Sequence, residues 1–482
     1  MRKYLSYLLL SIVGYLTYLF AVNTSPIIDC PGIDSAVFIY IAKGMMRGLM
    51  PYVDMFDHKG PLMYLSQYWG LQTGLGVAGI WLLEATLFTG AVCVAFKNLR
   101  QLFGNAIAWV YVFLHMAFFV LTCECGDTTE SWALPFVTLT VVNLVKQIKL
   151  GHSWWDDFVV GVGVGAILLL RPNMVAAGIV YCFYVLVAAI QAKDIRRFFT
   201  QAVAVAGGMV VVMLPVVVWL VLKGALVEMW KDYIAFNLAY AARPVKEING
   251  NLYTTLYLMA GAVAFGCFIK PDVRKAFWWT FAVTALTWLI IAQKPLFTHY
   301  YEVMIPSMAL MLALTIRQRR LVVLPCLVLG LLGVFLSYKY ICGTLFHVVH
   351  LPTIKSEYLA KHKMPQSVRE ILWVDHIKYD QLDQLGSLIK EKDSVLVLGN
   401  ECVIYDKLGV STKSKYFYQS PIAKVDKKIH DSIEAEVKEG LPRYIIRGSD
   451  YMEFPVDVMS DCPYRLISEV KGYELYQRIS IE

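Results

Sequence analysis

The chain of 482 residues is 58% hydrophobic and only 17% charged, with a mean hydropathy of +0.55, which excludes an ordinary soluble protein. Residues 339–482 hold 20 of the 44 Lys and Arg and 21 of the 37 Asp and Glu. Nucleic-acid binding is disfavoured, because the net charge of +7 lies in loops between apolar segments and the C-terminal part is nearly neutral. We therefore expect an α-helical polytopic membrane domain over residues 1–338 and a soluble domain over residues 339–482.

About eleven apolar segments are candidates to cross the membrane, since a helix needs about 20 residues to span a hydrocarbon core of about 30 Å. In chain order they are residues 4–22, 77–96, 106–122, 132–145, 158–170, 174–191, 202–222, 252–268, 276–292, 300–316 and 321–338.

The basic residues predict the orientation of these segments. With the N-terminus inside, 15 of the 24 Lys and Arg before residue 339 lie on the cytoplasmic side. An odd number of spans then places the C-terminal domain outside. The first segment is longer than the apolar core of a signal peptide and lacks a convincing cleavage site, so we expect a retained anchor. The sequence thus predicts a multi-pass protein of the cytoplasmic (inner) membrane.

The acidic residues gather on the opposite face. Eleven of the 16 Asp and Glu before residue 339 lie in outer loops or at outer ends of spans, and four of them belong to the first outer loop, residues 23–76. Apolar residues at helical spacing predict an amphipathic surface helix over residues 34–50 and a second one over residues 61–76. Asp34 lies at the start of the first helix, where the helix dipole keeps a carboxylate ionised or where it caps the helix.

This loop carries motifs that resemble a known family. An early Asp34, a Gly48-x-x-Pro51-Tyr52 turn and the run from Asp57 through His58, Lys59, Gly60 and Pro61 to Leu62 are similar to the GT-C glycosyltransferases. The branch of protein O-mannosyltransferases and aminoarabinose transferases is the most similar. The resemblance implies a GT-C-like fold with an extracytoplasmic C-terminal domain. It also implies inverting transfer of a sugar, at the outer face, from a polyprenyl-phosphate donor to a hydroxyl or amine of a glycan, lipid or protein acceptor.

Such a transfer needs a general base for the acceptor and cations for the leaving phosphate. Many family members have two adjacent acids where this chain has Asp34 followed by Ser35, so we expect Asp57 to complete the catalytic pair. No cofactor is indicated with certainty, and a divalent cation is compatible with the acids. The expected phosphate ligands are Lys59, Arg171 and Arg243, and the expected substrate-binding residues are Tyr52, His58, Glu130, His299 and Tyr300.

Arg171 follows an apolar run that is too short to reach the outer surface. The 13 residues 158–170 rise about 20 Å, which is about 10 Å less than the hydrocarbon thickness. An arginine at that depth needs a polar cavity or a partner, such as a lipid phosphate, unless its side chain extends to the headgroups.

The C-terminal domain shows alternating helix and strand patterns. We expect helices over residues 375–390 and 429–437 and strands over residues 394–398, 444–446 and 474–476, which together form a small α/β domain. Two other functions compete with the enzyme: a transporter or lipid-linked glycan flippase, and a glycan polymerase or ligase that uses a pyrophosphate-linked donor. A transporter usually shows repeated halves with polar groups near the midplane, and no such repeat is evident.

Overall fold

The chain forms two compact units in the computed structural model, and each is described by itself. The helical unit comprises Met1–Ile27, Ile80–Val218 and Pro244–Pro352, and the loop unit comprises Ile28–Gly79, Trp219–Arg243 and Thr353–Glu482. The structure describes residues 2–26, 31–124, 126–242, 266, 269–291, 297–315, 382–420, 422–448, 459, 462–470 and 472–479.

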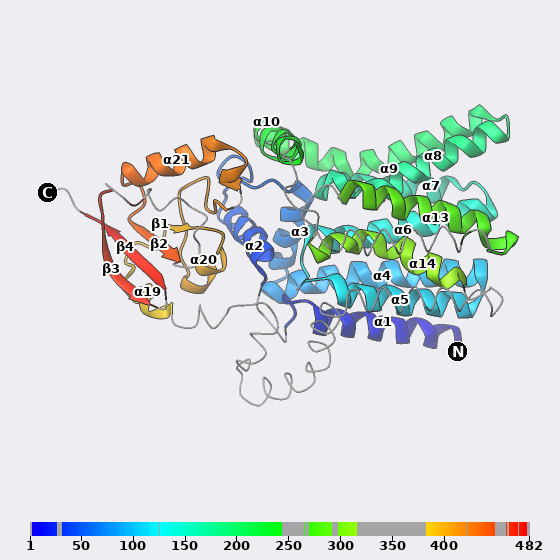
Figure 1. Ribbon diagram of the computed structural model, residues 1–482, viewed down its shortest axis with the longest axis horizontal. Coiled ribbons are helices and arrows are strands. Elements are labelled where there is room, and N and C mark those ends of the chain that lie inside the picture. The colour runs from blue at the N-terminus through cyan, green and yellow to red at the C-terminus, as the bar shows by residue number, and fades with distance from the viewer. Residues whose placement is uncertain are drawn as a thin grey trace. The chain divides into compact units, whose positions relative to one another are not determined.

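The helical unit is a bundle whose long helices share one general direction (Figure 1). Helix α6 is its centre, because it packs against α7, α8, α13 and α14. The helices that lie wholly or mostly in this unit are α1 (Arg2–Ala21), α4 (Val77–Phe103), α5 (Asn105–Thr122), α6 (Thr129–Leu150), α7 (Trp154–Leu170), α8 (Ala176–Gln191), α9 (Ile195–Leu222), α13 (Pro271–Ile291) and α14 (Ile305–Thr315), with 3-10 turns η1 (Pro172–Met174) and η3 (Thr298–Met304).

Five of these helices are long and apolar enough to cross a membrane: α1, α4, α5, α6 and α9. Since several such helices lie in one chain, this is a multi-pass membrane protein. Helices also form at the expected spans around α7, α8, α13 and α14. The expected span 321–338 lies outside the described residues, as does nearly all of 252–268, so the count of eleven stays a prediction.

Helices α7 and α9 approach each other through glycines. A Cβ atom on Gly161 would overlap the carbonyl oxygen of Val205, and one on Gly208 would overlap the carbonyl oxygen of Phe158. Small residues let two membrane helices come close enough for their backbones to pack, which is how such helices associate without a hydrophobic driving force.

Replacing Gly161 by Ala is therefore expected to destabilise the protein by about 1–3 kcal/mol, because the added methyl group meets backbone that must shift as a unit. Thermal unfolding of the purified chain in nanodiscs measures this effect. Gly90→Ala on α4 is the matched control, since a Cβ atom there meets no atom within 4 Å. Equal melting temperatures for the two variants would show that α7 and α9 do not pack through these glycines.

The loop unit combines three stretches that are distant in sequence. Its first stretch holds α2 (Ile33–Met46) and α3 (Pro61–Gln72), and its second holds α10 (Leu226–Met229), the π-helix η2 (Trp230–Ala235) and α11 (Phe236–Ala241). Its third stretch is the C-terminal α/β domain, made of α19 (Asp383–Leu388), β1 (Val395–Leu398), α20 (Val403–Leu408), the 3-10 turn η4 (Ile422–Lys424), α21 (Lys427–Lys438), β2 (Tyr444–Gly448), β3 (Tyr464–Val470) and β4 (Tyr473–Arg478).

The C-terminal domain has a four-stranded mixed sheet with the order β1-β2-β4-β3 (Figure 1). Strands β1 and β2 are parallel, whereas β4 is antiparallel to both β2 and β3. Helix α21 is amphipathic, and its Ile433 and Val437 pack with Leu396 and Ile445 of the sheet. The expected strands at β1, β2 and β4 and the expected helix at α21 are confirmed. Of the expected helix 375–390, residues 382–390 are described, and they are helical over α19.

Helix α2 differs from the expected amphipathic surface helix. Nine of its 14 residues are buried, and they lie on more than one face. Tyr40 explains part of this burial, because its ring packs 4.4 Å from the ring of Phe417 and 4.6 Å from that of Tyr405 in the C-terminal domain. The prediction of a surface helix was wrong because the sequence pattern could not include these distant aromatic partners.

Candidate active site

A tight turn in the loop unit carries Asp57, His58 and Lys59 to the start of α3. Before it, the chain reverses at Gly48, which has φ +91°, and at Tyr52, which has φ 69°. A positive φ is costly for a residue with a large side chain, so the surrounding contacts must hold Tyr52 in place. Pro61 then occupies the first turn of α3, where its missing N–H removes no helical hydrogen bond.

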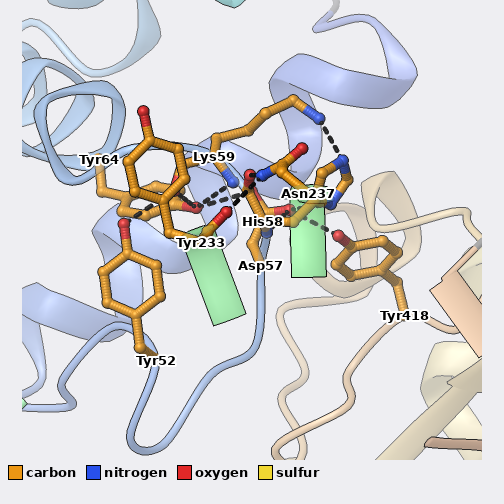
Figure 2. Close-up of polar contacts among 8 residues, drawn as sticks. All are labelled: Tyr52, Asp57, His58, Lys59, Tyr64, Tyr233, Asn237 and Tyr418. Carbon is orange, nitrogen blue, oxygen red and sulfur yellow. Dashed lines mark hydrogen bonds and ion pairs between the residues drawn. The ribbon is translucent and has the colours of Figure 1, made fainter. Parts of the chain in front are cut away.

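Asp57 is the buried centre of this turn, with only 1% of its surface exposed. Figure 2 shows the hydroxyls of Tyr64 and Tyr418 directed at its carboxylate. Tyr418 donates to Oδ1 at 2.6 Å and Tyr64 donates to Oδ2 at 2.9 Å. The backbone N–H of His58 also donates to Oδ1, at 2.7 Å. Both oxygens of Asp57 therefore accept hydrogen bonds from within the protein.

These contacts determine the charge state of Asp57. Burial alone would raise its pKa, but the hydrogen bond and charge of His58, the charge of Lys59 and the hydrogen bond from Tyr418 together hold the pKa well below its ordinary value. Burial and the charge of Asp57 raise the pKa of Tyr418 and of Tyr64 well above the usual value, so both remain protonated donors. Asp57 is thus ionised at neutral pH and is a weak base.

Lys59 is held by its backbone on both sides. Its N–H donates to the Tyr64 hydroxyl at 3.2 Å, and its carbonyl oxygen accepts from the Tyr52 hydroxyl at 2.8 Å. Its ammonium nitrogen lies 2.9 Å from Nε2 of His58, and Asn237 donates to the His58 carbonyl at 2.6 Å (Figure 2). The turn is therefore a rigid support for one cationic side chain.

Asp34 lies in the first turn of α2 and is exposed. It is not the helix cap, because the N-cap position is Gly32 and no side chain caps this end. Asp34 interacts electrostatically with Tyr418 and with Cys402, as Asp57 also does. Asp34 and Asp57, the two carboxylates expected from the sequence, therefore both interact electrostatically with Tyr418 and Cys402. One of them is exposed and the other is buried.

Asp57→Asn tests the structural role of this turn. The folded-state pKa of Asp57 is lowered, so its contribution to stability is complete above an unfolded-state pKa of about 4 and is lost as the pH falls below that value. We expect the variant to be less stable than the parent by about 2 kcal/mol at neutral pH, with a difference that shrinks in acid. Melting curves of the parent, of this variant and of the exposed control Asp393→Asn, recorded down to about pH 3, measure it. A difference that stays constant with pH would contradict the assignment.

A second polar cluster lies within the helical unit and contains Arg171, Glu130 and Tyr300. Arg171 is 6% exposed and ends α7, and its Nη1 donates to Oε1 of Glu130 at 2.5 Å. Its Nη2 donates to the Tyr300 hydroxyl at 3.3 Å, and its guanidinium carbon lies 4.9 Å from the centre of that ring. The structure thus brings three of the expected site residues together and gives Arg171 an internal partner.

His299 also has a carboxylate partner, which the sequence did not identify. Its Nδ1 lies 2.5 Å from Oε2 of Glu124, whose Oε1 accepts from the Thr298 N–H at 2.8 Å. Burial alone would raise the pKa of Glu124, but the hydrogen bond and charge of His299 and the bond from Thr298 outweigh burial and lower it. Glu124 has φ 38°, so its loop is held in a rare conformation next to η3.

Two further acids of the helical unit are fully buried. Glu84 on α4 and Glu302 in η3 both have 0% exposure. Glu302 interacts electrostatically with Glu130 and Glu124, and Glu84 interacts with Asp127 and Glu302. Glu130, the partner of Arg171, therefore has a fully buried acidic neighbour in Glu302, which the sequence analysis did not single out. Its only signal was its place among the eleven outer acids.

The expected residues thus fall into two clusters, one in each unit. Arg243 lies outside the described residues, so its expected role in phosphate binding stays a prediction. In the described ranges, the only group of three side chains with the spacing of metal ligands is His430, Asp431 and Glu434 on α21, and none of the expected site residues belongs to it. Tyr418, Tyr64 and Asn237 were not predicted to contact the turn.

Comparison with known proteins supports the fold. A family model described as "Putative competence-induced protein Ccs4 N-terminal domain" matches residues 5–321. ArnT from Cupriavidus metallidurans bound to undecaprenyl phosphate is 12% identical, with a TM-score of 0.64 over 100% of this chain and 98% of that one. The apo oligosaccharyltransferase of Archaeoglobus fulgidus is 13% identical, with a TM-score of 0.50 over 91% of this chain and 69% of that one. No curated protein matches the sequence. The likeness to these two solved structures confirms the predicted GT-C fold.

Proposed function

We propose that this chain, which belongs to the Ccs4 N-terminal domain family, transfers a sugar from a polyprenyl-phosphate carrier to a hydroxyl or amine of an acceptor. One of the two solved structures described above is named an oligosaccharyltransferase, and the other holds undecaprenyl phosphate. The observation that carries the proposal is the Asp57-His58-Lys59 turn, whose buried carboxylate is held by Tyr418 and Tyr64.

Asp34 is the general base of the proposed reaction. The acceptor oxygen or nitrogen forms a bond to the anomeric carbon, while the bond from that carbon to the phosphate oxygen breaks and its electron pair leaves with the carrier phosphate. The proton of the acceptor passes to Asp34. Attack from the face opposite the phosphate inverts the anomeric carbon. Exposure supports this role, because a base must reach its substrate.

Lys59 is the proposed ligand of the carrier phosphate. Its backbone is fixed through Tyr52 and Tyr64, so its ammonium can meet the developing charge without reorganisation. Arg171 is proposed as a second cation for the donor phosphate. The phosphate and the Glu130 carboxylate then compete for the Arg171 guanidinium. Tyr300 contacts Arg171, and His299 precedes Tyr300 in η3; both are proposed to contact the substrate.

In this proposal Asp57 is a positioning residue: it holds the turn that carries His58 and Lys59. Its two oxygens already accept hydrogen bonds from Tyr418, Tyr64 and the His58 backbone, and its low pKa makes it a poor proton acceptor. It orients the turn that carries Lys59 and His58. The sequence predicted a second catalytic carboxylate at this position, and the geometry favours an anchor.

The proposal also assigns the reaction to one face of the membrane. Transfer takes place at the outer face of the cytoplasmic membrane, with the N-terminus inside and residues 339–482 outside as an extracytoplasmic domain. The distribution of Lys and Arg along the chain supports this orientation.

Purified protein in nanodiscs, supplied with radiolabelled polyprenyl-phosphate sugar and an extract of cell-envelope acceptors, tests the function. We expect label to move from the lipid fraction to the acceptor fraction with inverted anomeric configuration. A pyrophosphate-linked donor should not compete. The proposal is wrong if the protein moves labelled solute across liposomes and transfers no sugar.

A further inference from the structure

One helical segment of the loop unit has an exposed apolar face. Residues 226–241 form α10, the π-helix η2 and α11, which follow one another without a break. Val227, Trp230 and Leu238 are 61–67% exposed, and Ile234 is half-buried. These four residues recur every three or four positions, which is the spacing of one face of a helix. They are called the apolar stripe below.

The other face of this segment packs on the turn of the candidate active site. Phe236 is buried, and the centre of its ring lies 5.2 Å from that of Phe56 and 5.4 Å from that of His58. The Nδ2 atom of Asn237 donates to the His58 carbonyl at 2.6 Å, as Figure 2 shows. These contacts fix the orientation of the helix, so the apolar stripe faces away from the turn.

The charged side chains of the segment have partners within the loop unit. Lys231 forms an ion pair with Glu228 at 2.7 Å. Lys415 of the C-terminal domain lies 2.9 Å from Oδ2 of Asp232 and 3.8 Å from Oε2 of Glu228. The two negative charges of the segment are therefore balanced by two positive ones. No net charge opposes contact of the apolar stripe with an apolar medium.

The segment begins where a candidate membrane span ends. Helix α9 is long and apolar enough to cross a membrane, and it ends at the exposed Leu222. Gly224, whose φ is +65°, then turns the chain. The three connecting residues 223–225 extend at most about 11 Å, so the helix starts close to the bilayer surface. Tryptophan and apolar side chains on one face of such a helix are typical of the membrane–water interface.

We propose that residues 226–241 lie in the membrane–water interface and that the apolar stripe inserts among the lipids of the leaflet in which α9 ends. This binding goes beyond the proposed sugar transfer and does not depend on it. A helix with its side chains is about 10–12 Å wide, so the His58 carbonyl on the opposite face is held about one helix diameter from the lipid. The helix thereby sets the height of the Asp57-His58-Lys59 turn above the membrane.

Photo-crosslinking of the full-length protein in phosphatidylcholine nanodiscs tests this surface. Trp230→p-benzoylphenylalanine and Leu238→p-benzoylphenylalanine should form covalent lipid adducts on irradiation. The matched control is the same replacement at Leu441, a leucine of the C-terminal domain that is 58% exposed, and it should form none. Lipid adducts of equal yield at all three positions would overturn the inference, as would their absence at Trp230 and Leu238. A covalent dimer at Leu238 without lipid adduct would also overturn it and identify an interface between two copies.

Hydrogen exchange in the same nanodiscs tests whether lipid contact supports the helix. Leu238→Glu places a carboxylate in the interface, so the amides of residues 230–241 should exchange at least about ten-fold faster than in the parent. Leu238→Phe should keep the parental rates. Leu441→Glu makes the same change at a leucine of similar exposure and should leave these amides unchanged.

The amides of β2 are the internal reference in this measurement. Their exchange should be unchanged in Leu238→Glu, because the exposed Leu238 is not part of the core of the C-terminal domain. Parental exchange of residues 230–241 in Leu238→Glu would show that the apolar stripe faces water, and the inference would be wrong. If the β2 amides also exchange faster, the variant has unfolded and the lipid adducts at Trp230 and Leu238 decide.

Discussion

Replacing Asp34 by Asn is expected to lower kcat for sugar transfer by about 10²- to 10⁴-fold, the usual contribution of a general base. The amide has nearly the same shape as the carboxylate but cannot take the proton of the acceptor. Asp34 is exposed and caps no helix, so the variant should fold as the parent does. Affinity for the polyprenyl-phosphate sugar should stay the same, because the carboxylate acts on the acceptor and not on the donor phosphate.

Single-turnover transfer with labelled donor measures this effect, alongside a separate measurement of donor binding. Asp393→Asn makes the same chemical change at an exposed carboxylate of the C-terminal domain and should transfer at the parental rate. Parental transfer by Asp34→Asn would remove Asp34 from the mechanism. A loss of donor binding equal to the loss of rate would also do so, because Asp34 would then bind the donor.

Removing the carboxylate of Glu130 is expected to destabilise the helical unit by about 3–5 kcal/mol. Arg171 is 6% exposed, and Glu130→Met would leave its charge buried without the 2.5 Å contact to Oε1. The remaining Tyr300 hydroxyl, at 3.3 Å from Nη2, is a neutral partner and compensates only weakly. Melting of the purified variant in nanodiscs measures the loss.

The double variant Glu130→Met with Arg171→Met is the control for this pair. It removes both charges, so it should recover most of the stability that the single variant loses, since two apolar side chains replace a buried ion pair at little cost. Additive losses in the double variant would show that the two residues do not form a pair. A double variant that folds but transfers no sugar would support the proposed role of Arg171 at the donor phosphate.

Local patterns in the sequence predicted the elements that carry the site. The apolar spacing after Asp34 predicted α2, and Pro61 marked the start of α3. The apolar runs of the C-terminal domain predicted β1, β2 and β4, because a short buried strand is recognisable from its own residues. The length of the run before Arg171 placed this residue below the outer surface, with a polar cavity or a partner such as a lipid phosphate, or with a side chain that extends to the headgroups. The structure shows a buried arginine whose partner is Glu130.

The contacts that complete the site could not be predicted in this way. Tyr418 donates to Asp57 across 361 residues of sequence, and His299 pairs with Glu124 across 175. No periodicity relates such positions, because they meet only when the loop unit or the helical unit has folded. The same limit explains why α2 was expected on a surface: its Tyr40 lies between two rings from the other end of the chain.

The assembly of the loop unit from three distant stretches also sets an order of events during synthesis. The first outer loop leaves the ribosome early, yet the hydroxyl that binds Oδ1 of Asp57 belongs to Tyr418, which is made hundreds of residues later. A chain truncated before that point keeps the acidic turn without its final donor. Nascent or prematurely terminated chains therefore lack the hydrogen bond from Tyr418 to Asp57 when they insert into the bilayer. Only the full-length polypeptide can form it.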